Sequence, residues 1–250
     1  MRTMMEEYAP PRYKILGKIG EGVHGLVVKA LDQKTNQFVA IKKLSLKNKN
    51  GGIQLSTLRE IKVLQNCNYE HIITLIDMFP DVSGPSLVFE YMPFTLYSKL
   101  KDEHKPLCRR DIKNYARMLF KGLKYMHELN LMHRDIKPAN LLIDQNDILK
   151  LGDFGLSRIG TTDIEQLALV IRTLGTPRVS DWPELQQLPD YHKIRFPYSK
   201  GDVWENLFPS PTIREEIKLV DALIKYNPKK RLTANKALNH EYFASNFKVV

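Results

Sequence analysis

The sequence of 250 residues contains little cysteine and no long hydrophobic run. Its two cysteines, Cys67 and Cys108, lie far apart, without the short spacing of metal-binding pairs. No apolar stretch reaches the roughly 18 residues that are needed to cross a bilayer. The amino terminus carries acidic residues and lacks the apolar core of a secretory signal. We therefore expect a reduced protein of the cytoplasm, the nucleus or both, without a membrane partner.

Acidic residues are fewer than basic ones: the chain has 28 Asp and Glu and 38 Lys and Arg, which gives a net charge of +10. The basic residues are spread along the chain, and their densest clusters, residues 47–49 and 229–231, are short. No aromatic-rich platform for single strands accompanies them, so we predict no nucleic-acid partner. Phosphate ligands and acidic protein partners explain such a surface equally well, and most charge runs are simply solvated.

The most informative stretch is residues 132–140, which read Met-His-Arg-Asp-Ile-Lys-Pro-Ala-Asn. After a predicted hairpin, residues 153–155 read Asp-Phe-Gly. The order and spacing of these residues match the catalytic loop and the metal-binding tripeptide of protein kinases. A lone His-Arg-Asp would mean little, but this many matched positions in order are specific.

Each polar residue of this pattern has a chemical role in phosphoryl transfer. The carboxylate of Asp135 is placed to take the proton of an acceptor hydroxyl, and Lys137 to neutralise a phosphate. Asn140 and Asp153 supply oxygen atoms for Mg²⁺. His133 is an alternative general base, but in this arrangement we expect it to pack as a structural residue.

A glycine-rich stretch, residues 19–27, reads G-x-G-x-x-G-x-V. Glycine allows the backbone to turn tightly over phosphates, where a Cβ would collide. The pattern overlaps the dinucleotide fingerprint, but no helix follows its last glycine, so a hairpin over a nucleotide is favoured. The predicted ATP contacts here are Ile19, Gly20, Glu21, Gly22, Gly25 and Val27.

Lys42 ends a predicted strand and is expected to contact the α- and β-phosphates of ATP. The alternative is a surface lysine at a strand end, which is how we interpret its neighbour Lys43. Residues 55–66 have helical periodicity. Glu60 in this helix is the natural ion-pair partner of Lys42; the alternative is an exposed helix acid.

Two further predicted strands, residues 72–78 and 87–89, close a small sheet. The residues after them should present backbone groups to an adenine ring. The predicted contacts with the adenine end of ATP are Ala40, Glu90, Met92 and Leu142, with Leu142 under the purine.

A long amphipathic helix is predicted over residues 110–128, with Gly122 as a close-packing position. Its apolar stripe is Ile112, Tyr115, Leu119, Leu123 and Met126. Residues 141–143 and 148–151 form the predicted hairpin. Further on, residues 192–210 have the pattern of a loop, and residues 213–226 and 233–242 that of helices.

Together the motifs resemble a eukaryotic protein kinase of the cyclin-dependent branch, in the CMGC group. Residues 90–92 resemble that branch's hinge, and residues 58–61 resemble its cyclin-facing helix, whereas residues 54–57 depart from the usual form. Residues 174–177 and 182–185 also belong to this branch, and the resemblance is greatest to the cell cycle-related kinase.

The resemblance implies an α+β, two-lobe fold with an antiparallel sheet in the N-lobe and a helical, truncated C-lobe. The implied boundaries are a disordered lead over 1–12, an N-lobe over 13–92 and a C-lobe over 93–250. It also implies a serine/threonine protein kinase that uses ATP and Mg²⁺, acts on protein substrates and has a cyclin-like activator. Lys137, within Asp-x-Lys-Pro-x-Asn, favours serine and threonine acceptors.

The chain departs from this family by an internal deletion near residues 158–163. The family has an activation loop, an Ala-Pro-Glu motif and a central helix after Arg158. Here residues 162–165 form a capping box instead, which predicts a helix that ends at Gly175. A splice variant, a gene-model error and a divergent protein all remain open.

The deletion has predicted costs. Five large buried side chains contribute roughly 1.5 to 3 kcal/mol each, so their loss approaches a whole domain's stability of about 5 to 15 kcal/mol. Arg134 loses its usual phosphate partner, and Arg231 its usual glutamate. We expect reduced activity on peptides. The alternatives are a catalytically impaired protein that binds a nucleotide or a partner, and a chain that does not fold.

Overall fold

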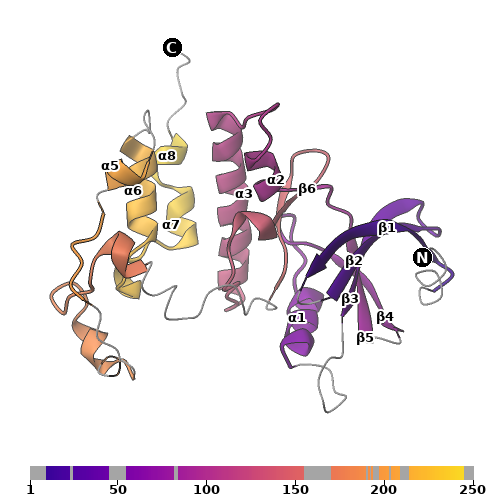
Figure 1. Cartoon of the computed structure of the whole chain (residues 1–250), viewed down its shortest axis with the longest axis horizontal. Helices are drawn as coiled ribbons and strands as arrows, with labels where there is room; N and C mark the ends of the chain where they lie inside the picture. The colour runs from indigo at the N-terminus through magenta and orange to yellow at the C-terminus, as the bar shows by residue number, and fades with distance from the viewer. Residues whose placement is uncertain are drawn as a thin grey trace. The chain divides into compact units, whose positions relative to one another are not determined.

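The computed structural model of the chain describes residues 10–22, 25–44, 55–81, 84–154, 170–189, 191, 193, 197–202, 204–208 and 214–244 (Figure 1). For residues 55–60, 205 and 206 it describes the backbone alone. The chain divides into two compact units, Met1–Ser157 and Arg158–Val250. The predicted lobe boundary after residue 92 falls inside the first unit.

The first unit contains a five-stranded antiparallel sheet with the order β1-β2-β3-β5-β4. Its strands are β1 (Tyr13–Gly22), β2 (Gly25–Asp32), β3 (Gln37–Leu44), β4 (Leu75–Asp81) and β5 (Gly84–Glu90). Side chains alternate between the two faces of a strand, and one face buries Val28, Ala30, Val39, Ile41 and Val88. The antiparallel sheet predicted for the N-lobe is confirmed.

The predicted strand over residues 72–78 begins three residues too early. Ile72 instead forms an isolated parallel bridge with Leu151, and β4 starts at Leu75. Ile72 and Ile73 are both buried. Apolar residues in a short run do not reveal which of them pair within a sheet and which pack beneath it.

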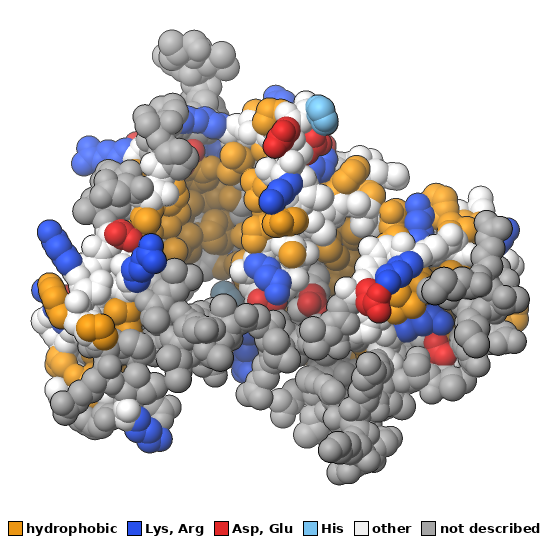
Figure 2. All heavy atoms as spheres, viewed as in Figure 1, with side chains coloured by type: hydrophobic (Ala, Val, Ile, Leu, Met, Phe, Trp, Pro, Cys, Tyr) orange, Lys and Arg blue, Asp and Glu red, His pale blue; other side chains and the backbone are white. Residues whose placement is uncertain are grey.

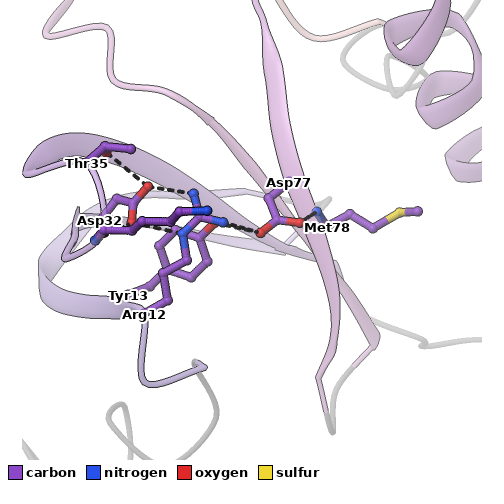
Figure 3. A network of polar contacts seen from close by, with 7 residues as sticks. Arg12, Tyr13, Asp32, Thr35, Asp77 and Met78 are labelled. Carbon is purple, nitrogen blue, oxygen red and sulfur yellow. Dashed lines mark hydrogen bonds and ion pairs between the residues drawn. The ribbon is translucent and has the colours of Figure 1, made fainter.

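A polar network ties the start of β1 to two other parts of the sheet (Figure 3). The guanidinium of Arg12 donates to both carboxylate oxygens of Asp32, at 2.9 and 2.7 Å, and to Asp77 at 3.1 Å. The hydroxyl of Tyr13 donates to the same Asp77 oxygen at 2.7 Å. The hydrogen bonds from Arg12 lower the pKa of Asp32. The last residues of the predicted disordered lead, 1–12, are therefore held in place.

The helices of the first unit are α1 (Leu55–Asn66), α2 (Leu96–Leu100) and α3 (Arg109–Glu128). A second sheet has the order β6-β7-β8, from β6 (Phe94–Thr95), β7 (Leu141–Ile143) and β8 (Leu149–Leu151). The short 3₁₀ helix η1 (Pro138–Asn140) precedes β7. The predictions of α1, α3 and the β7–β8 hairpin are confirmed to within a residue at each end.

Helix α3 packs on β8 through Gly122. A Cβ on Gly122 would lie 2.8 Å from Leu151 Cδ1 and 2.9 Å from the carbonyl oxygen of His71. Real Cβ contacts are not this short, so only glycine allows the helix to approach the hairpin this closely. The predicted close-packing role of Gly122 is confirmed.

The predicted apolar stripe of α3 is wrong at its first position. Ile112 is 44% exposed, whereas Lys113 and Phe120 are buried. These two buried positions are seven apart and so lie on the same side of the helix. Tyr115, one turn after Ile112, is buried as predicted, so Ile112 is the uncovered start of the stripe, while the neighbouring Lys113 is covered. Polarity alone could not indicate this difference.

The second unit is built from short helices. They are η2 (Pro183–Gln187), α5 (Trp204–Leu207), α6 (Arg214–Leu223), η3 (Pro228–Lys230), α7 (Ala234–Leu238) and α8 (Glu241–Ala244), with α6 against α5 and α8. Residues 170–174 are helical and end at Gly175, whose φ of 82° provides the predicted stop. The start of that predicted helix lies outside the described residues.

Three predictions in this unit need correction. The helix predicted over 233–242 is two helices, because α7 ends at Leu238 and the chain turns before α8 begins at Glu241. The loop predicted over 192–210 contains the helix α5. The helix predicted over 213–226 ends at Leu223. The expected cap at Thr233 is present, since its hydroxyl accepts the Lys236 N–H at 3.3 Å.

Among the described helices, we find none that combines the length and the apolar character needed to span a membrane. Figure 2 shows the lysine and arginine side chains of the visible face scattered among apolar and neutral atoms. On this face the described basic residues do not gather into one patch.

Candidate active site

The catalytic loop brings three of the predicted residues together. The carboxylate Oδ2 of Asp135 lies 2.7 Å from Lys137 Nζ and 2.5 Å from Asn140 Nδ2. Asn140 also donates to the backbone carbonyl of Asp135, at 3.0 Å, and is only 7% exposed. Asn140 therefore fixes both the loop backbone and the carboxylate of Asp135, while Lys137 stays half exposed.

Two residues of this site have left-handed backbone angles. The φ of Arg134 is 68° and that of Asp153 is 58°. Such angles are uncommon for residues other than glycine, and they concentrate at functional sites, where the surrounding contacts hold them. They turn the chain sharply just before Asp135 and at Asp153, the two predicted catalytic and metal-binding acids.

His133 packs as a structural residue, as predicted. Its Nε2 donates to the carbonyl oxygen of Gly152 at 2.9 Å, and its Nδ1 accepts the N–H of Asp135 at 3.3 Å. Its ring centroid lies 5.0 Å from that of Phe154. Burial lowers the pKa of His133, so the ring is neutral. Both ring nitrogens are occupied by the backbone, which leaves Asp135 as the better base.

Lys42, near the end of β3, reaches the metal-binding acid. Its Nζ lies 2.9 Å from Asp153 Oδ1, and the two side chains are 14% and 28% exposed. The predicted pair between Lys42 and Glu60 lies outside the described residues, because the side chains of residues 55–60 are not described. The lysine and the carboxylate that are predicted to bind phosphate and Mg²⁺ thus lie in direct contact.

Strand register places several predicted ATP contacts on one face of the sheet. Val27 pairs with Lys42, and Lys29 pairs with Ala40, across β2 and β3. Because cross-strand partners share a face, these four side chains lie on the same side. The intervening residues, such as Ile41, are buried on the opposite side. This is the arrangement that a nucleotide lying along the sheet requires.

The glycine-rich stretch forms the predicted hairpin between β1 and β2. Gly25 has a φ of 127°, and a Cβ there would lie 2.0 Å from the carbonyl oxygen of Lys43. Close approach of the third strand therefore requires glycine even without a nucleotide. Of the remaining predicted contacts, Gly20 and Gly22 lie on β1, Ile19 is 47% exposed, and Glu21 pairs with Lys18. Residues 23–24 lie outside the described residues.

The predicted adenine contacts lie around the end of β5, since Ala40 is opposite Phe89, and Lys150, which is opposite Leu142, contacts Glu90. Met92 and Leu142 are partly buried against the core that contains Leu151. A Cβ on Gly152 would lie 2.7 Å from Leu142 Cδ1, so Gly152 leaves room for this leucine. The side chain of Glu90 is bound by Lys150 and its N–H donates to the carbonyl oxygen of Thr74 at 3.4 Å, so its own carbonyl oxygen is the group considered for recognition.

The prediction that Lys43 faces solvent is wrong. Its Nζ lies 3.2 Å from Asp81, and the two side chains are only 13% and 3% exposed. A carboxylate buried to this extent needs a nearby positive charge. Lys42 and Lys43 are adjacent on β3 and face opposite sides of the sheet, so each serves a different carboxylate.

Sequence reasoning missed two lysines of this region, Lys29 and Lys150. Lys29 contacts the ring of Tyr91, and Lys150 contacts the carboxylate of Glu90. Strand alternation was the available signal for Lys29, since it lies two residues after Val27. Nothing in the sequence indicated a partner for Lys150.

The residues present fit Mg²⁺ together with a polyphosphate. Among the described residues no group of three or more His, Cys, Asp or Glu side chains is arranged to hold a metal. Magnesium does not require one, since it is commonly held by one or two protein oxygens with substrate phosphates and water. The side-chain oxygens of Asn140 and Asp153 are of this kind, and Lys42 beside them supplies positive charge for the phosphates.

Arg231, predicted to lack its usual glutamate, is satisfied by the backbone. Its guanidinium donates to the carbonyl oxygen of Lys225 at 3.1 and 2.9 Å, and to that of Tyr226 at 3.5 Å. These carbonyls follow the end of α6, where positive charge is favourable.

The second unit has a cavity of about 350 Å³, whose lining includes Trp204, Asp221 and Tyr226. The indole Nε1 of Trp204 donates to Asp221 across 2.9 Å. None of the predicted ATP or magnesium ligands lines this cavity, so it is not the nucleotide site.

Comparison with known proteins agrees with this geometry. Residues 13–179 match the family described as "Protein kinase domain". Relatives include cyclin-dependent kinase 20 from Danio rerio, 36% identical, and from Homo sapiens, 34% identical; each comparison covers 93% of this chain and 83% of the relative. Cyclin-dependent kinase D-1 from Arabidopsis thaliana is 33% identical over 94% of this chain and 71% of the relative.

The comparison with cyclin-dependent kinase 20 extends over 287 residues, more than this chain contains. The relatives therefore carry residues that this chain lacks, which agrees with the predicted internal deletion. The matched residues nevertheless include the glycine-rich hairpin, the catalytic loop and Asp153. The chain belongs to the protein kinase family, in its cyclin-dependent branch.

Proposed function

We propose that this protein is an ATP-dependent serine/threonine kinase that transfers the γ-phosphoryl group to proteins. The observation that carries the proposal is the convergence of Asp135, Lys137 and Asn140 in one loop, together with the contact between Asp153 and Lys42. The relatives named as cyclin-dependent kinases support the same activity.

The proposed magnesium ligands are Asn140 and Asp153. When bound, ATP supplies the phosphoryl group, and magnesium neutralises the negative charge that develops during its transfer. Lys42 binds the α- and β-phosphates. Its contact with Asp153 holds the phosphate-binding lysine next to the metal-binding carboxylate. Most of this catalysis is positioning, so the short contacts that fix these side chains matter more than any single covalent step.

Asp135 is the proposed base. Its carboxylate orients the acceptor hydroxyl and takes its proton, while Lys137 neutralises the transferred phosphoryl group. Lys137 is 50% exposed and lies 2.7 Å from Asp135, so it can exchange this partner for a phosphate at little cost. His133 takes no part in proton transfer, because its Nε2 donates to Gly152 and its Nδ1 accepts from the backbone.

The proposed acceptor and activator are inferred from the kinase family and from the catalytic loop, residues 132–140. Protein serine or threonine is the proposed acceptor, since Lys137 occupies the position typical of kinases for these residues. A cyclin-like protein is the proposed activator, and the cytoplasm, the nucleus or both the proposed location. The deletion removes the family's platform for the acceptor peptide, so we expect a low rate with peptides.

The test uses the purified chain. We expect Mg²⁺ and ATP together to raise the thermal unfolding midpoint, and radiolabelled γ-phosphate to appear on a serine or threonine peptide. Asp135→Asn should lower the transfer rate by about 10² to 10⁴ and keep the thermal shift. Binding without transfer by the unaltered chain would support the impaired alternative. Absence of a cooperative unfolding transition would support a chain that does not fold.

A further inference from the structure

A cation lies between two aromatic rings next to the predicted adenine contacts. The ammonium of Lys29 is 4.1 Å from the ring centroid of Phe38 and 4.2 Å from that of Tyr91. The two ring centroids are 6.3 Å apart, with 69° between their planes. Phe38 belongs to β3 and Tyr91 follows β5, so Lys29 connects the sheet to the first residue after it.

A second lysine holds the preceding residue. Lys150 Nζ lies 2.8 Å from each carboxylate oxygen of Glu90. One of these oxygens also accepts the N–H of Thr74 at 2.8 Å. The side chains of Lys150 and Glu90 are only 14% and 28% exposed, so water screens this pair less than a surface pair. Lys150 lies on β8, three residues before Asp153.

The two lysines belong to different sheets and restrain two consecutive residues, Glu90 and Tyr91. Glu90 is the last residue of β5, opposite Val39, and Tyr91 follows it. In an extended chain, successive side chains point to opposite sides. Fixing Glu90 through β8 and Tyr91 through β2 therefore restrains rotation of the backbone between them. That rotation sets the direction of the Glu90 C=O and the Tyr91 N–H, and with them the direction in which the backbone continues to Met92.

We propose that Lys29 and Lys150 are positioning residues that orient the backbone of residues 90–92 for adenine. The proposal rests on the proposed function, since it assigns a role within the same ATP site. It adds a specific division of labour: Lys42 serves the phosphates, whereas Lys29 and Lys150 act through the side chains of Tyr91 and Glu90. Loss of either lysine weakens recognition of the base and leaves the phosphate contacts of Lys42 in place.

The experiment measures the dissociation constants of magnesium ADP and magnesium GDP by calorimetry. Both nucleotides use the same phosphate contacts, so their ratio reports base recognition alone. We expect Lys29→Met and Lys150→Met each to reduce the preference for ADP by about three- to tenfold, the range that loss of a cation–π or charged contact gives. A merely structural defect would weaken both nucleotides equally.

Two further variants complete the design. Lys29→Arg should restore the preference, because a guanidinium also stacks on aromatic rings. Lys14→Met is the matched control, since Lys14 is an exposed lysine of β1 and the same change there should leave the ratio unaltered. Thermal unfolding of every variant verifies that it folds. If Lys150→Met does not fold, Lys29→Met still provides the test, because Lys29 contacts rings that are partly exposed and its loss should cost less stability.

The outcomes separate the two proposals. An unaltered preference for ADP in both methionine variants overturns the positioning role and leaves the kinase proposal intact. A lost preference that Lys29→Arg fails to restore also counts against the cation–π contact. Absence of ADP binding by the unaltered chain overturns both proposals.

Discussion

The phosphate end and the adenine end of the candidate site are built differently. At the phosphate end, charged side chains meet directly, as Lys42 does with Asp153 and Lys137 with Asp135. At the adenine end, the proposed recognition groups belong to the backbone of residues 90–92, and side chains only hold it. A motif therefore identifies the first end, whereas the second depends on contacts that no motif contains.

Exposure separates the lysine of the catalytic loop from the two sheltered lysines, Lys42 and Lys150. Lys137 is 50% exposed in its pair with Asp135, whereas Lys150 is 14% exposed in its pair with Glu90. An exposed pair contributes little to stability and exchanges partners easily. A sheltered pair is more costly to break, which suits a residue that holds the chain in one position.

The largest expected effect comes from Asp135→Asn at the phosphate end. The substitution keeps the shape of the side chain and removes its basicity, so the transfer rate should fall by about 10² to 10⁴. ADP affinity should stay within about twofold, because the adenine end is untouched. Rapid-quench transfer assays and calorimetry measure these two quantities. Asp102→Asn, in an exposed loop, is the control, and equal rates in both variants would refute the assigned base.

Two adjacent lysines give the next comparison. Lys42→Met should lower kcat/KM for ATP by about 10² or more, because Lys42 is the proposed phosphate contact. It should lower the free energy of unfolding less than Lys43→Met does, because its partner Asp153 is 28% exposed and Asp81 only 3%. Lys43→Met should lower the free energy of unfolding by about 1 to 3 kcal/mol, because it leaves the buried Asp81 with less compensation. Kinetic assays and urea unfolding distinguish them, and a reversed pattern would contradict the register of β3.

Gly122→Ala tests the support beneath the phosphate end. The new Cβ would collide with Leu151 and with the backbone of His71, at a cost of about 1 to 3 kcal/mol in the free energy of unfolding. Better helix propensity offsets this by about 1 kcal/mol. Gly17→Ala is the control, since its Cβ would meet nothing within 4 Å. Equal stability of the two variants would show that α3 does not pack on β8 this closely.

Acid should lower the free energy of unfolding through two buried histidines, His71 and His133. Burial lowers the pKa of His71 and of His133, so the unfolded chain binds their protons more readily than the folded protein. Their contribution to stability is complete above the unfolded pKa of about 6.5 and is lost as pH falls below it, by up to about 1.4 kcal/mol per unit for each. Among the described residues, the Nε2 of His71 has no hydrogen-bond partner; the carboxylate of Glu70, 3.7 Å away, offsets part of the effect of burial on the pKa of His71.

Urea unfolding at pH 7.5, 6.5 and 5.5 measures this acid sensitivity. A constant free energy of unfolding over this range would contradict it. The loss should be smaller in His71→Asn, which removes one of the two titrating groups. The smallest effects are expected from Lys29→Met and Lys150→Met at the adenine end, which should reduce the preference for ADP by about three- to tenfold.

Local signals in the sequence predicted much of this structure. The periodicity of residues 55–66, the long amphipathic pattern before the catalytic loop and the hairpin after it all correspond to observed elements. The errors at Ile112 and Lys43 have a common origin. Each depends on which face of an element is covered, and this is decided by residues distant in the chain.

The sequence by itself determined the family and the residues proposed for catalysis, because phosphoryl transfer requires particular side chains at nearly constant spacing. Only the tertiary structure decided which lysine meets which carboxylate. Lys150 and Glu90 are separated by 60 residues, and Lys42 and Asp153 by 111. Such pairs form through strand register and sheet packing, which place distant residues together without leaving a local pattern in the chain.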